Sequence, residues 1–527
     1  MVTKTIAGQI RSMGEKFIAG TDAADALPQL KKFWDRNIAF SVDLLGEACL
    51  SDAEAGMYQQ KYLDLINNLP ETVNSWPARA TLENDHLGPI PRTNVSIKIS
   101  SLFARTDPMH MDATLDGLME MLGPILEAAG RRNVFINFDM EQEELKDLTL
   151  DLFMRACEQY DFPAGLAMQA YLRSGDEDAR RVIDWSKRTG RQVTVRLVKG
   201  AYWDYETIHA EQHDWPVPVW SRKIDTDACF ERMTRQFVEA IPRDADEGGV
   251  KLALGSHNVR SIAVAMALLE KHNLPTSALE LQMLHGMADE LKAVAVDRDL
   301  RVREYVPVGE MIPGMAYLVR RLLENTSNES WLKAGFLEDK AAEKLLESPH
   351  KKFVEDPGER LIEQAPERHQ LGPAVEGVGD GRPFYSEPHR DFSDKRQRDR
   401  FEQTLRNVEV PHVANDSTVE DATRAVQQAH EAFPAWRDMD PVKRARILTD
   451  AAQIMRDRRD ELSGIVLKES GKRWRGADAD VCEAIDFIEY YARHAVHLFQ
   501  PERLGQFIGE FDAQWYQPRG VAAIISP

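Results

Sequence analysis

The stretch that decides the fold is Gln192-Val-Thr-Val-Arg-Leu-Val-Lys-Gly-Ala-Tyr-Trp-Asp204. Its first seven residues are rich in valine and leucine, which predicts a strand buried on both faces. Residues 199–201 are lysine, glycine and alanine, so a ligand could meet positive charge and bare backbone there. Residues 202 and 203 are aromatic and could lie on a flat ring. This combination favours a cofactor that carries phosphates and a ring, although an ordinary turn from strand to helix would show the same pattern.

Strand-like runs recur along the first 310 residues, with helical patterns between them. Alternation of strands and helices over roughly 300 residues predicts a parallel sheet. Eight such strands favour closure into a (β/α)8 barrel of the TIM type, with an open doubly wound sheet as the alternative. The eight predicted strands are residues 38–44, 95–100, 134–139, 165–170, 192–198, 251–256, 279–283 and 302–306.

Polar and charged side chains stand at the ends of these predicted strands. In a barrel of parallel strands these ends converge on one face, which is where barrel enzymes place their active sites. A single polar residue at a strand end is usually only a cap, but several facing one mouth predict a site. They are Asp43, Lys98, Asp139, Gln169, Arg196, Lys199, Ser256, His257 and Tyr305.

The length and composition limit the classes of function. A chain of 527 residues is too long for one core and predicts two or three domains. Its net charge of -20 would repel a phosphate backbone, so we expect no nucleic-acid partner. The four cysteines are far apart in the sequence, which fits a reducing cytoplasm. No apolar stretch reaches about 18 residues, which predicts a soluble protein and leaves peripheral membrane contact open.

The second part of the chain differs in character. Proline, glycine and charged residues crowd residues 346–400, which predicts a linker. The glycine-rich stretch 377–381 in this linker lacks the flanking strand and helix that a nucleotide-binding loop needs. We therefore expect a barrel domain with a short helical N-terminal arm at 1–345, a linker at 346–400 and a mainly helical segment at 401–527. In that segment the predicted elements are helices at 417–437, 441–460, 461–470 and 477–497 and a strand at 520–525.

Two further patterns bear on ligands. Arg320 and Arg321 lie in a predicted helix at 314–325 and could clamp a small carboxylate together with Lys98. A solvated arginine pair with Glu324 is the alternative. The sequence His209-Ala-Glu-Gln-His213 has i,i+4 histidines but is not the H-E-x-x-H pattern of zinc enzymes, so we predict no metal.

Several motifs together resemble the proline dehydrogenase family, in particular the dehydrogenase domain of bifunctional proline utilization A proteins, over roughly residues 30 to 335. The resemblance implies a distorted (β/α)8 barrel with non-covalent FAD that oxidises L-proline to 1-pyrroline-5-carboxylate. It also implies a membrane quinone as electron acceptor. Together with the cysteine pattern, this predicts a cytoplasmic protein and leaves peripheral contact with the inner membrane open. The motifs are Val95–Ser100, Arg196–Asp204, Ser256–Asn258, Leu284–Met287 and Tyr317–Glu324.

The resemblance assigns roles residue by residue. Asp139 and Arg196 correspond to the catalytic pair. The substrate-binding residues would be Lys98, Leu197, Tyr202, Leu284, Tyr305, Tyr317, Arg320 and Arg321. The FAD contacts would be Gln169, Arg196, Lys199, Gly200, Ala201, Trp203, Ser256, His257 and Glu324, with Ser256 standing where many members have threonine.

Residues from about 400 onward resemble the opening of the aldehyde dehydrogenase superfamily. The resemblance rests on Ala432–Arg437, Glu469–Lys472 and Pro518–Pro527. We expect this segment to be truncated, inactive as an NAD-dependent dehydrogenase, and open to self-association or pairing with another chain. We also expect no N-terminal DNA-binding segment. The alternatives to proline oxidation are a non-catalytic scaffold that docks on a separate aldehyde dehydrogenase chain, and an FAD barrel that oxidises another cyclic amino acid such as hydroxyproline.

Overall fold

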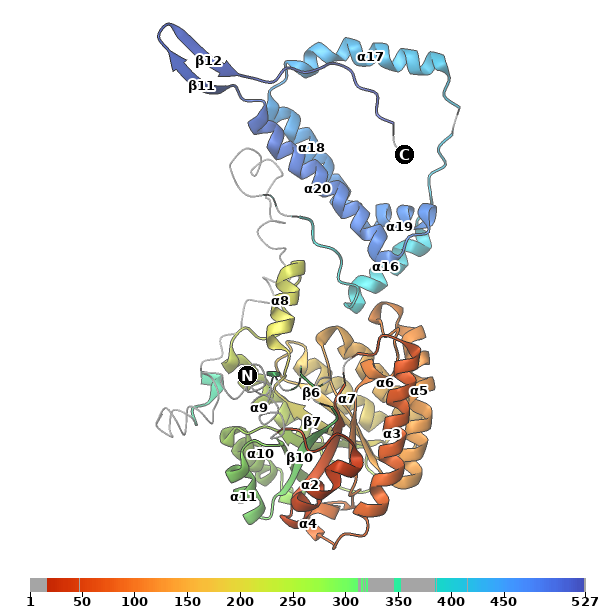
Figure 1. The fold of residues 1–527 in the computed structure, drawn as a ribbon, viewed down its shortest axis with the longest axis vertical. Helices are drawn as coiled ribbons and strands as arrows, with labels where there is room; N and C mark the ends of the chain where they lie inside the picture. The colour runs from red at the N-terminus through yellow and green to blue at the C-terminus, as the bar shows by residue number, and fades with distance from the viewer. Residues whose placement is uncertain are drawn as a thin grey trace, which may run out of the picture. The chain divides into compact units, whose positions relative to one another are not determined.

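Eight parallel strands close into a barrel in which neighbouring strands follow one another along the chain (Figure 1). The first strand pairs with the last on one side and with the second on the other, so the sheet has no free edge. This arrangement confirms the predicted (β/α)8 barrel and excludes the open sheet. The strands are β1 (Ala39–Leu44), β4 (Asn94–Ile97), β5 (Phe135–Phe138), β6 (Ala164–Gln169), β7 (Gln192–Val198), β8 (Gly249–Gly255), β9 (Leu279–Leu284) and β10 (Arg301–Val308).

The structure is a computed structural model and describes residues 17–46, 48–310, 314–315, 317, 319–320, 346–351, 384, 386–414 and 416–525. The chain divides into two compact units, which are described separately below. One comprises residues 1–209 and 217–356, and the other comprises residues 210–216 and 357–527. Of the predicted helix at 314–325, only residues 314, 315, 317, 319 and 320 belong to the described part.

Helices join the strands and surround the barrel (Figure 1). The longer ones are α2 (Ala23–Asp35), α3 (Asp52–Val73), α5 (Met111–Arg132), α6 (Lys146–Gln159), α7 (Gly175–Thr189), α8 (Trp203–His213), α9 (Lys223–Glu239), α10 (Val259–Lys271) and α11 (Asp289–Asp297). The shorter elements are α4 (Ala80–Glu83), β2 (Asn84–Asp85), β3 (Gly88–Pro89), η1 (Ile99–Ser101), η2 (Pro108–His110), η3 (Glu143–Leu145), η4 (Thr276–Ala278) and η5 (Pro349–Lys351).

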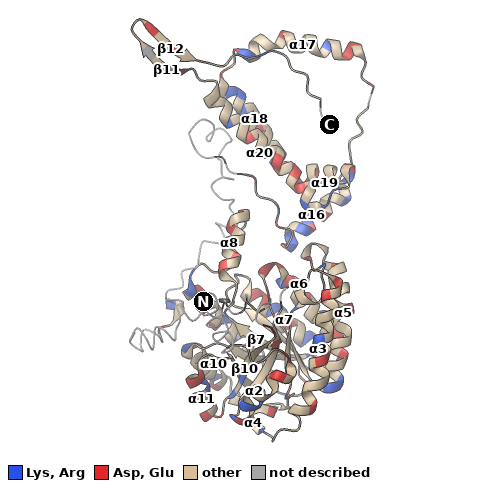
Figure 2. Cartoon of the chain, viewed as in Figure 1, with Lys and Arg blue, Asp and Glu red and all other residues tan. Residues whose placement is uncertain are grey.

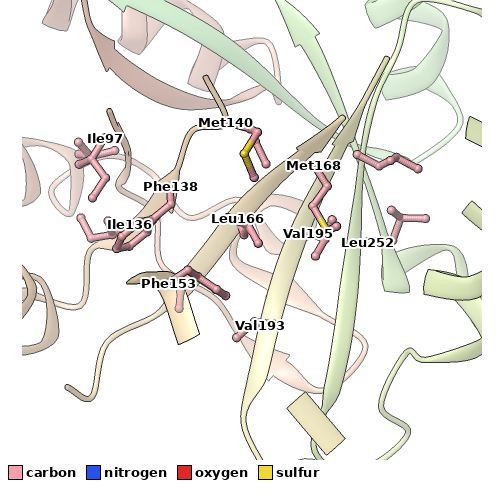
Figure 3. Packing of buried hydrophobic residues seen from close by; sticks show 14 of the residues in the cluster. Ile97, Ile136, Phe138, Met140, Phe153, Leu166, Met168, Val193, Val195 and Leu252 are labelled. Atoms are coloured by element: carbon pink, nitrogen blue, oxygen red, sulfur yellow. The ribbon is translucent and has the colours of Figure 1, made fainter. Parts of the chain in front are cut away.

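The outer face of the barrel is apolar and packs against these helices. Figure 3 shows side chains of Phe138, Leu166 and Val195 gathered between strands and helices. Phe138 meets Phe153 of α6 edge to face at 5.4 Å between ring centroids, and Phe153 in turn meets Trp185 of α7 at 6.0 Å. All of them are buried in one hydrophobic cluster, so burial of apolar surface holds the helices against the sheet.

Residues of both signs of charge are spread along the helices around the barrel, as Figure 2 shows. Some of these charges join neighbouring helices. Arg181 of α7 pairs with Asp147 and Asp151 of α6. Since these groups are partly exposed, each pair contributes no more than about 1 kcal/mol.

The inner face of the barrel is polar instead. Side chains alternate between the two faces of a strand, so every second residue of β1, β9 and β10 points inward. These inward positions hold serine, acidic, amide, arginine and tyrosine side chains that hydrogen-bond across the barrel. The interior therefore supplies charged groups, rather than branched apolar ones, to the carboxyl end of the strands. The polar residues among these inward positions are Ser41, Asp43, Glu280, Gln282, Arg301, Arg303 and Tyr305.

The second unit is mainly helical. An aromatic cluster of Phe392, Phe401 and Trp474 joins its first helix to its last one, with ring centroids 5.2 to 5.7 Å apart. Arg459 donates two hydrogen bonds to the buried Asp478, at 2.8 and 2.6 Å. The elements are α16 (Lys395–Asn407), α17 (Val419–Arg437), α18 (Pro441–Asp457), α19 (Arg459–Ser470), α20 (Trp474–Leu498), β11 (Glu502–Phe507) and β12 (Glu510–Gln514).

The strand predicted at 520–525 is wrong. Those residues form no strand in the described part of the chain, and Ile524 and Ile525 are 91% and 92% exposed. An apolar run needs a neighbouring strand to hydrogen-bond with, and no strand among the described residues pairs with it. The sequence reasoning instead missed the hairpin of β11 and β12, which turns at Ile508 and Gly509, where Gly509 has φ +87°.

The domain boundaries at 345 and 400 stay a prediction. The one at 400 falls inside α16, which begins at Lys395. Phe392 and Phe401, on either side of it, pack against each other with ring centroids 5.5 Å apart. Residues at the end of the predicted linker therefore pack as part of the helical unit.

Candidate active site

Asp139 follows β5 and stands at the centre of a polar cluster inside the barrel. Its Oδ1 accepts hydrogen bonds from Arg196 Nη1 at 2.7 Å and from Asn137 Nδ2 at 3.0 Å. Its Oδ2 accepts from the hydroxyl of Tyr305 at 2.8 Å, and Lys98 Nζ lies 3.7 Å away. Arg196 and Tyr305 thus reach this buried carboxylate from β7 and β10. Lys98 and Asp139 directly follow β4 and β5.

Arg196 of β7 is buried and engages the cluster with all three of its nitrogens. Nη1 donates to Asp139, and Nε donates to Gln282 Oε1 at 2.6 Å. Nη2 donates to the hydroxyls of Ser96 at 3.0 Å and Ser41 at 3.3 Å. A planar guanidinium held at every nitrogen has a fixed orientation, so its charge is directed rather than merely present.

Lys98 follows β4 and lies between two carboxylates. Its ammonium pairs with Asp43 and approaches Asp139. Burial by itself would lower the pKa of Lys98, but the two negative charges outweigh burial and raise the pKa above its ordinary value. Burial raises the pKa of Asp43, and its buried Oδ2 has no hydrogen-bond partner in the structure. The site therefore keeps a charged ammonium next to a carboxylate oxygen that is free to accept.

Tyr305 of β10 completes the cluster. Its ring lies under the guanidinium of Arg196, with Cζ 5.0 Å from the ring centroid. Burial, and then the negative charge of Asp139, raise the pKa of Tyr305 well above its usual value. The phenol therefore stays protonated and acts as a hydrogen-bond donor to Asp139.

Lys199 directly follows β7 and is paired with a carboxylate. Its ammonium pairs with Asp227 of α9, whose other carboxylate oxygen accepts from Lys223 at 2.8 Å. Burial lowers the pKa of Lys199, although Asp227 opposes that effect. A ligand phosphate at this position would meet two cations that already share one carboxylate.

Position 200 requires glycine because the ring of Tyr171 packs against it. Its φ is +135°, and a Cβ built on it would stand 2.4 Å from Cγ of Tyr171. A side chain would therefore both strain the backbone and overlap the ring. The glycine that the sequence offered as bare backbone for a ligand is explained by close packing against Tyr171.

Gln169 ends β6 and is the FAD candidate with spare hydrogen-bonding capacity. Its amide nitrogen donates to the carbonyl oxygens of Met140 and Glu141, at 3.4 and 3.1 Å. Its Oε1 is buried and has no partner in the structure. A buried acceptor left unsatisfied is unfavourable unless a ligand or water donates to it.

Ser256 and His257, at the end of β8, stabilise their own loop. Ser256 Oγ accepts from the backbone amide of Asn258 at 3.1 Å, and His257 Nε2 accepts from that of Leu284 at 3.1 Å. His257 therefore joins two of the loops at the carboxyl ends of the strands. Ala201 lies in the loop after β7, the strand that pairs with β8, and is exposed.

The remaining candidates lie in different surroundings. Arg320 lies over the ring of Tyr202, with Cζ 4.8 Å from the centroid, and Tyr317 and Leu284 pack in one small cluster with Tyr305. Leu197 points to the opposite face of β7 from Arg196 and is buried in the main hydrophobic cluster. Trp203 is 41% exposed and donates to the carbonyl oxygen of Trp220 at 2.8 Å. Arg321 and Glu324 lie outside the described residues.

The structure thus brings together Asp139, Arg196, Lys98 and Tyr305 by direct contact, while their assigned roles stay predictions. Sequence reasoning missed the partners that hold Arg196, namely Ser41, Ser96 and Gln282. The alternation of polar residues along the strands indicated that these side chains face the barrel interior, but not that they contact Arg196. Among the described residues no group of three His, Cys, Asp or Glu side chains is placed to hold a metal ion.

Glu206 is a buried carboxylate that was not among the predicted site residues. It lies on α8, is 4% exposed, and accepts a hydrogen bond from the backbone amide of Glu143 at 2.8 Å. Burial raises its pKa to about 7, against the opposing effect of that hydrogen bond. Its charge therefore changes near neutral pH.

We expect the Glu206→Gln variant to gain stability relative to the wild type as the pH rises. A carboxyl whose pKa is raised in the folded state opposes folding once it must ionise, so the penalty is absent below about pH 4.5 and complete above about pH 7. The gain at pH 8 should exceed that at pH 5 by roughly 2 to 3 kcal/mol in urea unfolding. The exposed Asp204→Asn on the same helix serves as control, and an equal gain at both pH values would refute the pKa.

Comparison with known families gives two matches. Residues 26–334 match the family described as Proline dehydrogenase, and residues 398–527 match the Aldehyde dehydrogenase family. The chain is 28% identical over 573 residues to the bifunctional protein PutA of Salmonella typhimurium, covering 100% of this chain and 40% of that protein. It is also 37% identical over 177 residues to 1-pyrroline-5-carboxylate dehydrogenase 1 of Halalkalibacterium halodurans, covering 28% of this chain and 34% of that protein.

Solved structures agree with these matches. The crystal structure of proline utilization A (PutA) from Bdellovibrio bacteriovorus, inactivated by N-propargylglycine, superposes with a TM-score of 0.87 at 36% identity. The superposition covers 98% of this chain and 55% of that one. A Bradyrhizobium japonicum PutA mutant, D779W, gives a TM-score of 0.75 at 26% identity and is covered over 49% of its length. The chain therefore spans about half the length of these solved structures.

Proposed function

Because the chain belongs to the proline dehydrogenase family, we propose that its barrel binds FAD and oxidises L-proline to 1-pyrroline-5-carboxylate. The observation that carries the proposal is the contact of Asp139 with Arg196, Tyr305 and Lys98 inside the barrel mouth. A small zwitterion such as proline needs a cation for its carboxylate and a negative group near its amine. The cluster offers both within a few ångströms.

The residues of the mouth fit the chemistry of FAD. The buried Gln169 Oε1 lacks a donor, and the N3–H of a flavin ring is a donor of that kind. Arg196 offers an oriented positive charge, which favours electron density on an adjacent ring. Lys199 lies beyond it with an ammonium suited to a phosphate. When bound, the flavin accepts the hydride that leaves the substrate.

The side chains of this chain would bind and orient the substrate. Lys98 and Arg320 would hold the carboxylate, while Tyr202, which lies under Arg320, would fix the position of that arginine. Asp139 would stabilise the substrate amine, and the unpaired Asp43 Oδ2 could take up a proton that the amine loses. Since the amine must release a proton before its carbon gives up a hydride, a nearby acceptor oxygen assists the step.

Electron transfer to a membrane quinone forms the second half of the proposal. It includes a cytoplasmic location with peripheral contact at the inner membrane, and it is supported by the family resemblance. No helix in the described residues is both long enough and apolar enough to span a bilayer.

The function is tested by dye-linked oxidation with the purified chain. We expect dye reduction and formation of 1-pyrroline-5-carboxylate with L-proline, in a preparation that contains bound flavin. Faster turnover of hydroxyproline than of proline would favour the alternative cyclic amino acid. A flavin-free preparation that neither binds added FAD nor oxidises either amino acid would leave the scaffold as the better account.

Replacing Arg320 with methionine should raise the KM for L-proline more than it lowers FAD retention. A lost charge-assisted hydrogen bond costs about 1.5 to 3 kcal/mol, which corresponds to a roughly 10- to 100-fold rise in KM. Steady-state kinetics and the flavin content of the same preparation measure the two effects. The control is Arg105→Met, which also removes a guanidinium from an aromatic ring, that of Phe103 at 5.2 Å, but on an exposed side chain. An unchanged KM in the Arg320 variant would contradict the carboxylate assignment.

A further inference from the structure

A chain of buried charged and amide groups lies behind Arg196 inside the barrel. Glu280 of β9 accepts two hydrogen bonds from Arg303 of β10, at 2.8 and 3.0 Å, and one from Arg301 at 3.1 Å. All of these side chains are buried. The two arginines therefore fix the carboxylate of Glu280 in one position, on the strand next to their own.

Gln282 connects this group to Arg196. Its Nε2 donates to Glu280 Oε1 at 2.7 Å, and its Oε1 accepts from Arg196 Nε at 2.6 Å. A carboxylate can only accept hydrogen bonds and a guanidinium can only donate them. The amide of Gln282 can therefore satisfy both neighbours in one orientation only, and a flipped amide would satisfy neither.

Glu280 stays ionised over the whole working range of pH. Burial would raise its pKa, but Arg303 and Arg301 outweigh burial and lower the pKa to about 2. The orientation of the Gln282 amide is consequently independent of pH near neutrality. Glu280 differs from Asp43, because burial raises the pKa of the Asp43 carboxyl.

We propose that Glu280 and Gln282 are positioning residues that fix the plane of the Arg196 guanidinium for proline oxidation. Asp139, Ser96 and Ser41 hold the two terminal nitrogens of Arg196. Among the described residues Gln282 is the partner of Nε, which lies on the Cδ–Nε bond about which the guanidinium turns. Without Gln282 the buried Nε–H would lose its acceptor and the guanidinium could turn toward another one. The inference rests on the proposed function in that Arg196 is taken to act beside the bound flavin.

The first arm of the test needs no flavin. Nitrogen-15 NMR of arginine side chains in the full chain, with the Arg196 signal assigned through Arg196→Lys, reports the Nε–H directly. In Gln282→Leu we expect this signal to shift and its hydrogen exchange to accelerate about 10-fold or more, because a buried hydrogen bond is lost. Glu280→Gln should shift the same signal, since the amide of Gln282 is then no longer held in one orientation.

The second arm measures turnover in the flavin-loaded chain. Both variants should lower kcat for L-proline about 10-fold while the KM changes little, because Arg196 is not assigned to the substrate carboxylate. The exchanged pair Glu280→Gln with Gln282→Glu keeps the net charge and restores an acceptor for Arg196 Nε. It should therefore recover part of kcat, and it provides a folded variant if Gln282→Leu is unstable.

Two control variants separate positioning from general damage. Gln192→Leu removes three hydrogen bonds to backbone carbonyls at the other end of β7, about 13 Å along the strand from Arg196. Glu304→Gln neutralises a carboxylate that is 1% exposed and pairs with Lys292 on the outer face of β10. Both should leave the Arg196 signal and kcat at the wild-type values.

The outcomes are distinct. An Arg196 Nε–H unchanged in both Gln282→Leu and Glu280→Gln would overturn the positioning role, whatever the enzyme oxidises. A changed Nε–H with wild-type kcat would show that the orientation does not matter for the reaction, and would also overturn the inference. A wild-type chain that fails to oxidise proline would refute the proposed function, while the NMR arm would still decide whether Glu280 and Gln282 hold Arg196.

Discussion

Replacing Asp139 with alanine should reduce proline oxidation about 100-fold or more and destabilise the barrel by about 3 to 5 kcal/mol. The carboxylate is the common partner of Arg196 and Tyr305 and lies 3.7 Å from Lys98. Its removal leaves a buried guanidinium without its counter-charge, which is the most unfavourable way to break an ion pair. Urea unfolding measures the stability, and dye-linked kinetics on the folded variant measures the rate.

The control for this variant is Asp225→Ala. Asp225 is 0% exposed and accepts two hydrogen bonds at 2.7 Å from Arg222, but it lies at the start of α9 and away from the polar cluster. It should therefore lose stability while the folded enzyme keeps its kcat. If Asp139→Ala behaved in the same way, with wild-type turnover in the folded fraction, Asp139 would be a structural residue only.

Replacing Gly200 with alanine should have the second-largest effect, a loss of about 2 to 6 kcal/mol together with weaker flavin binding. The backbone there has φ +135°, which strains a residue with a side chain by about 1 to 3 kcal/mol. Overlap of the new Cβ with the ring of Tyr171, only 2.4 Å away, adds a similar amount. Thermal unfolding and FAD retention measure the two consequences.

Two further variants divide the effect into its parts. Gly190→Ala has a positive φ of +72° with nothing within 4 Å of the new Cβ, so it reports backbone strain alone. Gly200→Ala combined with Tyr171→Leu removes the ring and should recover the part due to overlap. If the single Gly200 variant were as stable as Gly190→Ala, the close packing against Tyr171 would play no role.

The pattern of the sequence was sufficient to predict the barrel and the proximity of the charged residues in its polar cluster. Strands and helices alternate clearly because the strands are short apolar runs, and parallel strands bring their carboxyl ends together. Asp139, Arg196 and Lys98 could therefore be expected near one another before their contacts were known. The outer face of the barrel could be predicted from hydrophobic residues at alternate positions of the strands.

The contacts that hold the site could not be predicted in the same way. Ser41 and Gln282 meet Arg196 from strands 155 and 86 residues away, and a single hydroxyl or amide inside a strand gives no local signal of such a partner. Gly200 pointed to a ligand, although its packing partner is Tyr171 of a different strand-end loop. The apolar run at 520–525 resembled a strand, but pairing depends on a neighbour that local sequence does not specify.

The most direct test of the account is the absorbance of flavin in the purified chain during anaerobic addition of L-proline. The account predicts that the flavin absorbance bleaches with proline and returns with a quinone, and that Asp139→Ala loaded with the same amount of FAD bleaches about 100-fold more slowly. A chain that carries a full complement of FAD, yet keeps its oxidised spectrum in excess L-proline, would contradict the account.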